Sequence, residues 1–232
     1  MVFNSIFFIF CFLPVFMLIY YLVPGKLRNL LLFLGSLIFY AWGEPVYVIL
    51  MLFSSIFNYY MGTELERLYY DDRKQKINLI LSIIINLAVL VFFKYYGFLL
   101  NTIGGIIGIH IPHPELSLPI GLSFYTFRNL SYLFDIYLSK VSAQRNFLTF
   151  SVYSTMFPYT SAGPIVRYTD IETQLKQRTI NISKFGIGAE LFVKGLAKKV
   201  LLADNLSILY SSICGHPQMS VFTSWLGILA YT

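Results

Sequence analysis

The side chains with the clearest chemical potential are charges placed inside an apolar, membrane-length run at residues 119–139. Arg128, Ser131 and Asp135 recur there at i, i+3 and i+7, so a helix would present them on one face. A charged side chain at the centre of a bilayer costs about 2.5 to 3.5 kcal/mol on insertion scales. We therefore predict that this face points into the protein interior or a water-filled cavity.

The two charges of this face need separate partners. At 1.5 Å per residue, Arg128 and Asp135 would lie about 10 Å apart along a helix axis, too far for an easy direct ion pair. Arg167 is a candidate partner for Asp135. Structural ion pairing is the interpretation we favour for these side chains, and contact with a bound ligand is the alternative.

Composition defines the class of protein that must position these residues. Hydrophobic residues make up 57% of the 232 residues and charged residues 12%, against about 25% charged in soluble domains. The sequence therefore predicts an integral membrane protein. The 17 Lys and Arg lie mostly in short segments between apolar runs, so the net charge of +6 indicates membrane topology and not nucleic-acid binding.

The apolar runs predict an all-α, polytopic transmembrane helical bundle that forms a single domain over residues 1–232. Placing Lys26 and Arg28 in the cytoplasm satisfies the positive-inside rule at each short loop and puts the amino terminus outside. Ser54, Ser55 and Asn58 are predicted to pack helices together. Ser183 is expected to cap an amphipathic surface helix that runs towards Leu209. We expect spanning or apolar helices at residues 3–23, 30–42, 46–62 and 77–93, and an irregular segment from 98 to 117. Residues 64–76 are expected to form a solvated loop, with a helix extension at its start as the alternative.

The run at residues 147–164 breaks this pattern. A full crossing would leave residues 167–199, with seven Lys and Arg, outside and against the positive-inside rule. Pro158, Gly163 and Pro164 interrupt the run, and prolines remove backbone donors. We predict a re-entrant element that enters from the cytoplasm, unwinds at these residues and returns. Unwound backbone is tolerated at membrane depth only inside protein or beside water, so the break should line a cavity.

A self-contained catalytic centre is not apparent. His110, His113 and His216 all fall in loops, and no nucleophile elbow, phosphate-binding loop or metal-ligand spacing occurs. Cys11 and Cys214 are read as packing residues without a disulfide. The final apolar run, residues 219–232, is too short to span a bilayer, so the chain is expected to stop in mid-helix.

Five phrases occur in an order that resembles one family, the membrane-bound O-acyltransferases, and most closely its alginate O-acetyltransferase-like subgroup. They are FNSIFFIFCFLP at 3–14, SLIFYAWGEP at 36–45, LPIGLSFYTF at 118–127, SAGPIVRYTDI at 161–171 and GLAKKVLLADNL at 195–206. The likeness covers essentially the whole chain but only the amino-terminal half of a typical member. Arg128 departs from the glutamine more common in the subgroup, and residues 159–161 replace a more apolar run.

The resemblance implies acyl transfer, with acetyl as the expected group, from a cytoplasmic thioester donor, acetyl-CoA or an acyl carrier. The implied acceptor is a hydroxyl of an exported or cell-surface polysaccharide, or an extracytoplasmic partner acyltransferase. It implies a multi-pass protein of the bacterial cytoplasmic membrane with no bound cofactor. The family's histidine base lies beyond residue 232, so no catalytic residue is assigned in this chain. Arg128, Ser131, Asp135 and Arg167 are then expected to contact the donor or line its tunnel.

Two other functions stay open on the sequence. Broken helices with intramembrane charge are also typical of secondary transporters, although those show matching interruptions in two related halves and this chain shows one. The chain alone is also compatible with an inactive truncated remnant that lacks the catalytic histidine.

Overall fold

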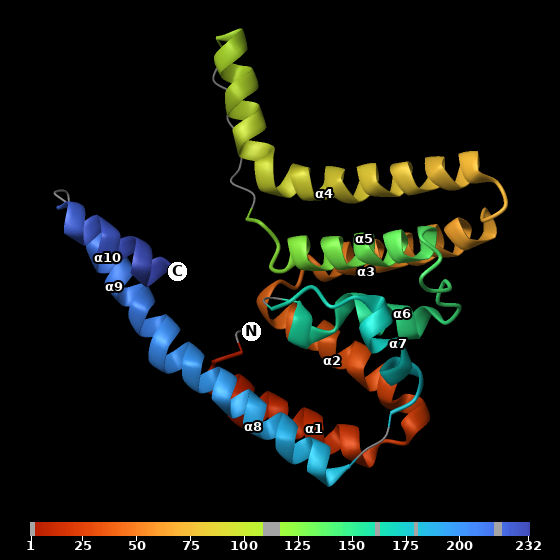
Figure 1. Ribbon diagram of the computed structural model, residues 1–232, viewed down its shortest axis with the longest axis horizontal. Coiled ribbons are helices and arrows are strands. Elements are labelled where there is room, and N and C mark those ends of the chain that lie inside the picture. Colours follow the sequence, from red (N-terminus) through yellow and green to blue (C-terminus); the bar gives the residue numbers. More distant parts are fainter. Residues whose placement is uncertain (1–2, 109–116, 161–162, 179–180, 216–219) are drawn as a thin grey trace. The chain divides into compact units, whose positions relative to one another are not determined.

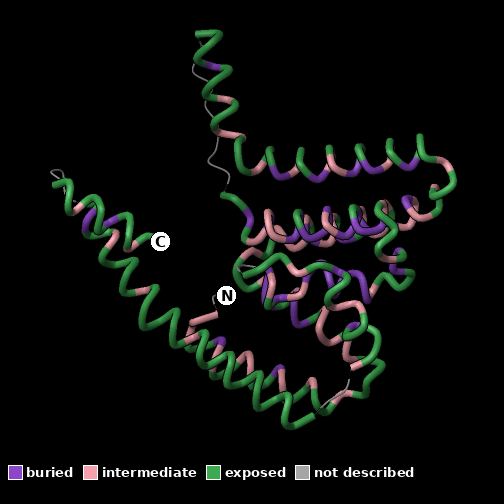
Figure 2. The backbone as a smooth tube through the Cα atoms, in the orientation of Figure 1, coloured by how far each residue is buried: buried purple, intermediate pink, exposed green. Residues whose placement is uncertain are grey.

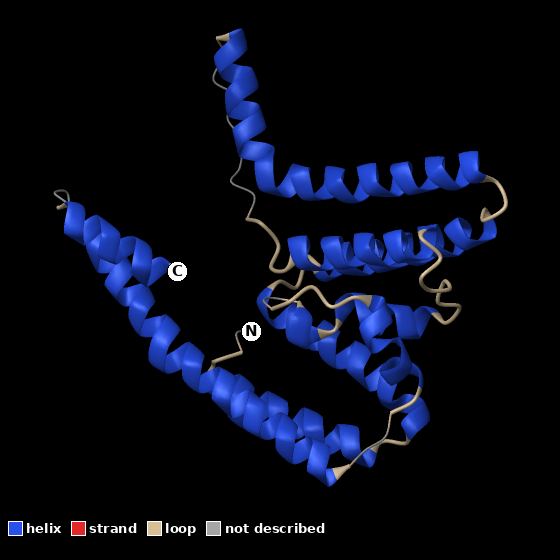
Figure 3. Cartoon of the chain, in the orientation of Figure 1, coloured by secondary structure: helices blue, strands red, loops and turns tan. Residues whose placement is uncertain are grey.

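The computed structural model describes residues 3–108, 117–160, 163–178, 181–215 and 220–232 (Figure 1). All regular structure in these ranges is helical, as Figure 3 shows, which confirms the predicted all-α class. The chain divides into two compact units. The first unit is residues 12–178, and the second combines residues 2–11 with residues 179–232.

The first unit begins with helices that the apolar runs predict. Its first helix is α1, Leu13–Leu22, which has Pro14 in its first turn. A π-helical turn, Phe8–Phe12, precedes α1 along the chain, and residues 8–11 of this turn belong to the second unit. A 3₁₀ turn, Gly25–Leu27, precedes α2, Arg28–Gly43, and the Gly-Glu-Pro turn separates α2 from α3, Val48–Arg67.

Helix α4, Asp72–Ile107, is longer than the sequence predicts. The charged segment at 64–76 starts as an extension of α3, which runs to Arg67, as the alternative prediction had it. Only residues 68–71 form a turn, because α4 already begins at Asp72. The Asp71 side chain caps α4 by accepting a hydrogen bond from the Lys74 amide at 3.1 Å, and hydrogen bonds from Lys74 lower the pKa of the Asp71 carboxyl. Helix α4 also continues through the expected irregular segment, changing direction in its carboxyl-terminal part (Figure 1), and ends only at Gly108, where φ is 73°.

The centre of the first unit is α5, Leu122–Tyr137, which packs against α3 and α4. Helix α6, Phe147–Thr155, packs against α2 and α3, and seven of its nine residues are buried. A 3₁₀ turn at Phe157–Tyr159 and helix α7, Tyr168–Lys176, follow. Figure 2 shows the buried positions concentrated on α5 and α6, while α4 buries one face only. The main apolar cluster joins Leu65, Tyr132, Leu133, Phe150, Tyr153 and Tyr168.

The polarity of the first unit is inverted relative to that of a soluble domain. The buried face of α4 carries Gln75, Ser82 and Asn86, whereas Ile80 and Ile84 between them are exposed. Polar groups buried between helices and apolar side chains facing outward are typical of a bundle in lipid. Among the described residues, α3 and α4 are long and apolar enough to cross a membrane, and Phe8–Leu22 and α10 are shorter apolar helices.

The second unit contains α8, Ile182–Lys198, a π-helical turn at Lys199–Ala203, α9, Asp204–Cys214, and α10, Val221–Tyr231. The amphipathic helix expected near 183–209 is present, with Glu190 and Lys194 paired at 2.6 Å. Its cap is Asn181 and not Ser183, because the Asn181 side chain accepts a hydrogen bond from the Ser183 amide at 2.8 Å. Helices α9 and α10 pack together, with the rings of Tyr210 and Tyr231 5.2 Å apart.

Candidate functional site: a buried arginine at a helix break

Arg128 lies at the centre of the candidate site. Its side chain is only 1% exposed, and it projects from α5 towards the carboxyl end of α6. One terminal nitrogen of its guanidinium donates hydrogen bonds to the backbone oxygens of Tyr153 at 3.1 Å and Ser154 at 3.3 Å, and the other donates to the backbone oxygen of Tyr159. The last carbonyls of a helix have no partner within it and carry partial negative charge, so a cation there satisfies both needs.

Two further contacts join Arg128 to the residues that accept its hydrogen bonds. The Tyr153 hydroxyl donates a hydrogen bond to the backbone oxygen of Arg128 at 3.1 Å, and the Arg128 guanidinium lies 5.6 Å from the centre of the Tyr159 ring. The Arg128 Nε is buried and has no hydrogen-bond partner among the described residues. Arg128 therefore joins α5 to the end of α6, and it does so through neutral backbone groups instead of the ion pair that we favoured from the sequence.

Asp135 is buried on the same helix, with 5% exposure, but its predicted partner is wrong. Its Oδ1 pairs with Lys140 Nζ at 3.9 Å, and within the described part of the chain its Oδ2 is buried without a hydrogen-bond partner. Arg167 is exposed, and its backbone amide donates to the Asp170 carboxylate at 3.3 Å in the cap of α7. Lys140 is nearer in sequence, just past the end of α5, and reaches back to Asp135. Ser131 is half-buried between the two charges.

The three residues of the expected helix break are more exposed than two of their described neighbours in the chain. Pro158, Gly163 and Pro164 are exposed in the isolated chain, whereas Phe157 and Thr160 beside them are buried. Helix α6 already ends at Thr155, one turn earlier than predicted. Gly163 has φ 115°, a conformation that L side chains rarely adopt. Cavity lining by these three residues stays a prediction.

We call α6, the 3₁₀ turn at Phe157–Tyr159 and α7 together the broken element. Its two ends lie at the same end of the bundle. The Asn29 amide, near the start of α2, donates to Thr149 Oγ1 at the start of α6 and to the Leu175 carbonyl at the end of α7, both at 3.2 Å. Deeper in the bundle, the Phe157 amide donates to Ser36 Oγ at 3.1 Å. Because Ser36 lies seven residues after Asn29, the element reaches about 10 Å along α2 before it turns back.

A second polar group joins α3, α4 and α5. The amides of Asn58 and Asn86 donate to each other at 3.0 and 2.9 Å, and the Asn129 amide donates to Ser54 Oγ at 3.2 Å. Ser55 bonds to Ser154 of α6 at 3.1 Å. The packing role predicted for the serines and the asparagine of α3 is therefore confirmed.

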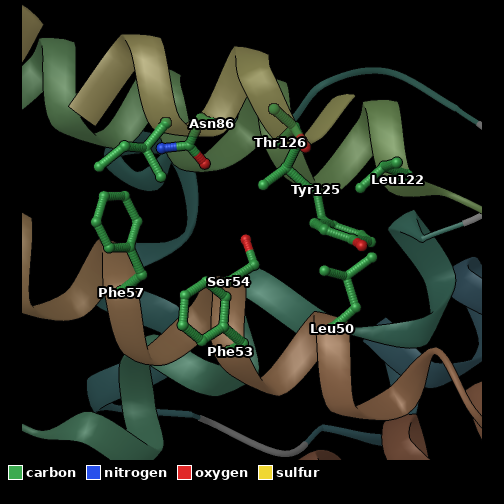
Figure 4. Close-up of a pocket in the computed structure, with 10 residues that line it drawn as sticks. Leu50, Phe53, Ser54, Phe57, Asn86, Leu122, Tyr125 and Thr126 are labelled. Carbon is green, nitrogen blue, oxygen red and sulfur yellow. The ribbon is translucent and has the colours of Figure 1, made fainter. Parts of the chain in front are cut away.

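A small pocket opens beside these amides (Figure 4). Figure 4 shows Ser54 and Asn86 facing it from α3 and α4, with Tyr125 and Thr126 contributed by α5. Most of its lining is apolar, including Leu50, Phe53, Phe57 and Leu122. Its volume is about 10 Å³, which is roughly the space of one water molecule, so it is a packing gap beside the amides and not a ligand site.

Sequence reasoning missed the α4 and α5 members of this polar group. A signal was present, because Asn78, Ser82 and Asn86 recur every four residues through an otherwise apolar run. A polar stripe at that spacing lies on one helix face and must be buried against another helix in lipid. Asn129 carries no comparable signal beyond its place next to Arg128.

The reciprocal amide pair makes a specific energetic prediction. In Asn58→Leu or Asn86→Leu, the remaining amide loses its partner, and we expect each single change to lower the free energy of unfolding by about 1 to 3 kcal/mol. The double variant should cost less than the sum, by at least about 0.5 kcal/mol, in thermal or denaturant unfolding in detergent. Asn58→Leu combined with Asn205→Leu, whose amide bonds to Leu201 within its own helical segment, is the additive control. Strict additivity at Asn58 and Asn86 would contradict the pairing.

The remaining sequence candidates contribute little to this site. His110, His113 and His216 lie outside the described residues. Within the described residues, no group of three or more His, Cys, Asp or Glu could hold a metal ion. Cys11 and Cys214 are free and exposed, so their predicted packing role is wrong for the isolated chain.

An all-helical bundle with apolar outer faces, buried amides and a buried arginine at a helix break is a membrane protein with a polar interior. No family model and no solved structure matches the chain. Among curated proteins, the chain is 37% identical to probable alginate O-acetylase AlgI of Pseudomonas aeruginosa and 36% identical to that of Azotobacter vinelandii, over 236 residues each. It is 30% identical over 267 residues to the peptidoglycan O-acetyltransferase of Helicobacter pylori.

The chain is homologous to these O-acetylases, which confirms the resemblance to the membrane-bound O-acyltransferase type. The matches include 100% of this chain and 45%, 47% and 50% of the three relatives. The chain therefore spans about half the length of the curated relatives it matches.

Proposed function

We propose that this chain is part of a membrane-bound O-acetyltransferase that modifies an exported or cell-surface polysaccharide in the bacterial cytoplasmic membrane. The observation that carries the proposal is homology, along the whole of this chain and about half of each relative, to enzymes named for two different polysaccharide acceptors, alginate and peptidoglycan. Because these names share the acetyl transfer and differ in the acceptor, the reaction class is supported better than the polymer.

The proposed reaction moves an acetyl group from a thioester, acetyl-CoA or an acyl carrier, to a hydroxyl. The C–S bond of the donor breaks, a C–O bond to the acceptor forms, and the hydroxyl proton passes to a base while the thiolate leaves. The family resemblance places that base, a histidine, beyond Thr232. The acceptor hydroxyl belongs to the polysaccharide itself or to an extracytoplasmic partner acyltransferase.

The proposal is supported by polar side chains that are buried on one face of α5. Arg128 holds the broken element against α5, and its Nε is buried without a hydrogen-bond partner among the described residues. We propose that this face borders a passage for the acyl group. Ser131 and the free Oδ2 of Asp135 continue the same face of α5. In this proposal Arg128 positions the passage, whereas Arg167, which is exposed in the cap of α7, lies at its cytoplasmic mouth.

The test of the function is chemical analysis of the cell surface. Deleting the full-length gene should remove most O-acetyl groups from one surface polysaccharide, measured by mass spectrometry after mild alkaline release, and a plasmid copy should restore them. A deletion strain with unchanged O-acetylation of every surface polymer would contradict the proposal. Normal O-acetylation with altered export of a solute would favour the transporter alternative.

The membrane orientation of the broken element is tested separately. The variant is Thr173→Cys, at an exposed position of α7, in a protein with Cys11 and Cys214 replaced by serine. It should react with thiol reagents only from the cytoplasmic side, because α6 begins and α7 ends at the same end of α2. Arg73→Cys, in the charged segment before the apolar part of α4, is the control for that side. Labelling of Thr173→Cys by a membrane-impermeant reagent added outside would show that the element crosses fully.

A further inference from the structure

A strongly cationic pocket lies at the end of the first unit where α2 begins and α7 ends. Its volume is about 280 Å³, close to the lower end of the range of about 300 to 1,000 Å³ for small-molecule sites. Lys26 and Arg28 line it from the start of α2, and Lys176 and Arg178 line it from the end of α7. These two segments are brought together by the hydrogen bond from Asn29 to Leu175, 146 positions away.

The pocket has a large excess of positive charge. All four charged residues of its lining are cations, and none is an acid. Lys176 is paired with Glu172 at 2.6 Å, but the structure as described shows no ion pair for Lys26, Arg28 or Arg178. Four like charges that converge in a concave site repel one another, and an anion in the pocket would relieve that repulsion.

Two hydrogen-bond donors in the pocket are buried without partners. Arg28 Nε and Arg178 Nη2 are inaccessible to solvent and make no hydrogen bond within the described residues. The Arg28 guanidinium lies 5.6 Å from the centre of the Tyr20 ring, which holds it in place. Buried N–H groups are normally satisfied, so the two arginines of this pocket keep unused hydrogen-bonding capacity beside it.

We propose that this pocket binds a phosphate group. A phosphate carries up to two negative charges and three acceptor oxygens, and the planar guanidinium groups of two arginines match its geometry while lysines supply point charge. The pocket also lies at the amino-terminal end of α2, where the helix dipole favours an anion. A carboxylate would neutralise only one of the four cations.

Two sources of phosphate fit the location. One is the phosphate of a soluble donor such as a coenzyme A thioester, and this source rests on the function proposed above. The other is the headgroup of an anionic phospholipid in the same leaflet. The two sources share the recognition chemistry, and separate measurements distinguish them.

The test uses the full-length protein in nanodiscs. In the first arm, with zwitterionic phosphatidylcholine, binding of adenosine 3′,5′-bisphosphate is measured by calorimetry. In the second arm, with phosphatidylglycerol added, lipid retained by the protein is measured by native mass spectrometry. Arg28→Gln combined with Arg178→Gln should weaken binding about tenfold or more in one of the arms, because two charge-assisted contacts are lost.

The control removes the same charge elsewhere. Arg73→Gln combined with Lys76→Gln alters exposed residues of α4 outside the pocket and should leave both measurements unchanged. If the arginine variant does not fold, the exposed pair Lys26→Gln and Lys176→Gln replaces it, with a smaller loss expected. Binding in both arms equal to that of the control would overturn the proposal. Polysaccharide O-acetylation is measured in the same arginine variant. If that variant loses phosphate binding but keeps O-acetylation, or keeps binding but loses O-acetylation, the pocket is independent of the proposed reaction.

Discussion

Gly121→Ala is expected to destabilise the first unit by about 3 kcal/mol or more. Gly121 precedes α5 with φ 75°, a left-handed conformation that costs a side-chain-bearing residue about 1 to 2 kcal/mol. A Cβ atom added there would also lie 2.1 Å from the backbone oxygen of Thr160. Because that neighbour is backbone, it can move only if the broken element shifts away from α5. The measurement is thermal unfolding in detergent, followed by size-exclusion chromatography.

The matched control for this change is Gly105→Ala. Gly105 lies inside α4, and an added Cβ would meet nothing within 4 Å, so alanine there should be neutral or stabilising by up to about 1 kcal/mol. If Gly121→Ala unfolded at the wild-type temperature, the close approach of Thr160 to α5 would be wrong. If both variants lost stability equally, the effect would be general to glycine replacement.

Arg128→Met is expected to have the second large effect, a loss of about 3 to 5 kcal/mol in stability and of most polysaccharide O-acetylation, with the protein still inserted in the membrane. Methionine fills a similar length with an apolar side chain, but it leaves three backbone carbonyls of the broken element without their hydrogen-bond donor. Each unsatisfied buried group costs about 1 to 3 kcal/mol. Unfolding in detergent and O-acetyl analysis of the surface polymer measure the two losses.

Two further variants separate charge from geometry at Arg128. Arg128→Lys keeps the charge but replaces the planar fork with a single ammonium, so it should recover only part of the stability. Arg67→Met, at an exposed arginine paired with Glu64 at 3.2 Å, should change stability by less than about 1 kcal/mol. An Arg128→Met protein with wild-type stability and O-acetylation would remove Arg128 from the site.

Sequence reasoning predicted burial correctly for side chains whose exposure to lipid would cost free energy. Arg128 and Asp135 were predicted to be buried because hydrocarbon excludes them, and both are buried. The partners of Arg128 could not be predicted, because they are backbone carbonyls, which every residue carries. The ion pair of Asp135 with Lys140 depends on how the chain turns after α5, and charge alone did not distinguish Lys140 from Arg167.

Helix boundaries were less predictable for a related reason. Glycines at 104 and 105 weaken a helix but do not end it, and α4 stops only where Gly108 turns into a left-handed conformation. The charged segment at 64–76 looks like a loop, yet the Asp71 cap allows α4 to start inside it. In both places local backbone geometry decided the boundary, and composition gave no sign of it.

The shortness of α6 has a consequence for transport through the bilayer. Nine residues rise about 14 Å, roughly half of a hydrocarbon layer about 30 Å thick. In the proposed orientation, the carbonyls held by Arg128 then lie near the mid-plane, about 15 Å from the opposite face. Under the function proposed above, an acetyl group brought to that depth would have only the remaining half-thickness of the bilayer to travel.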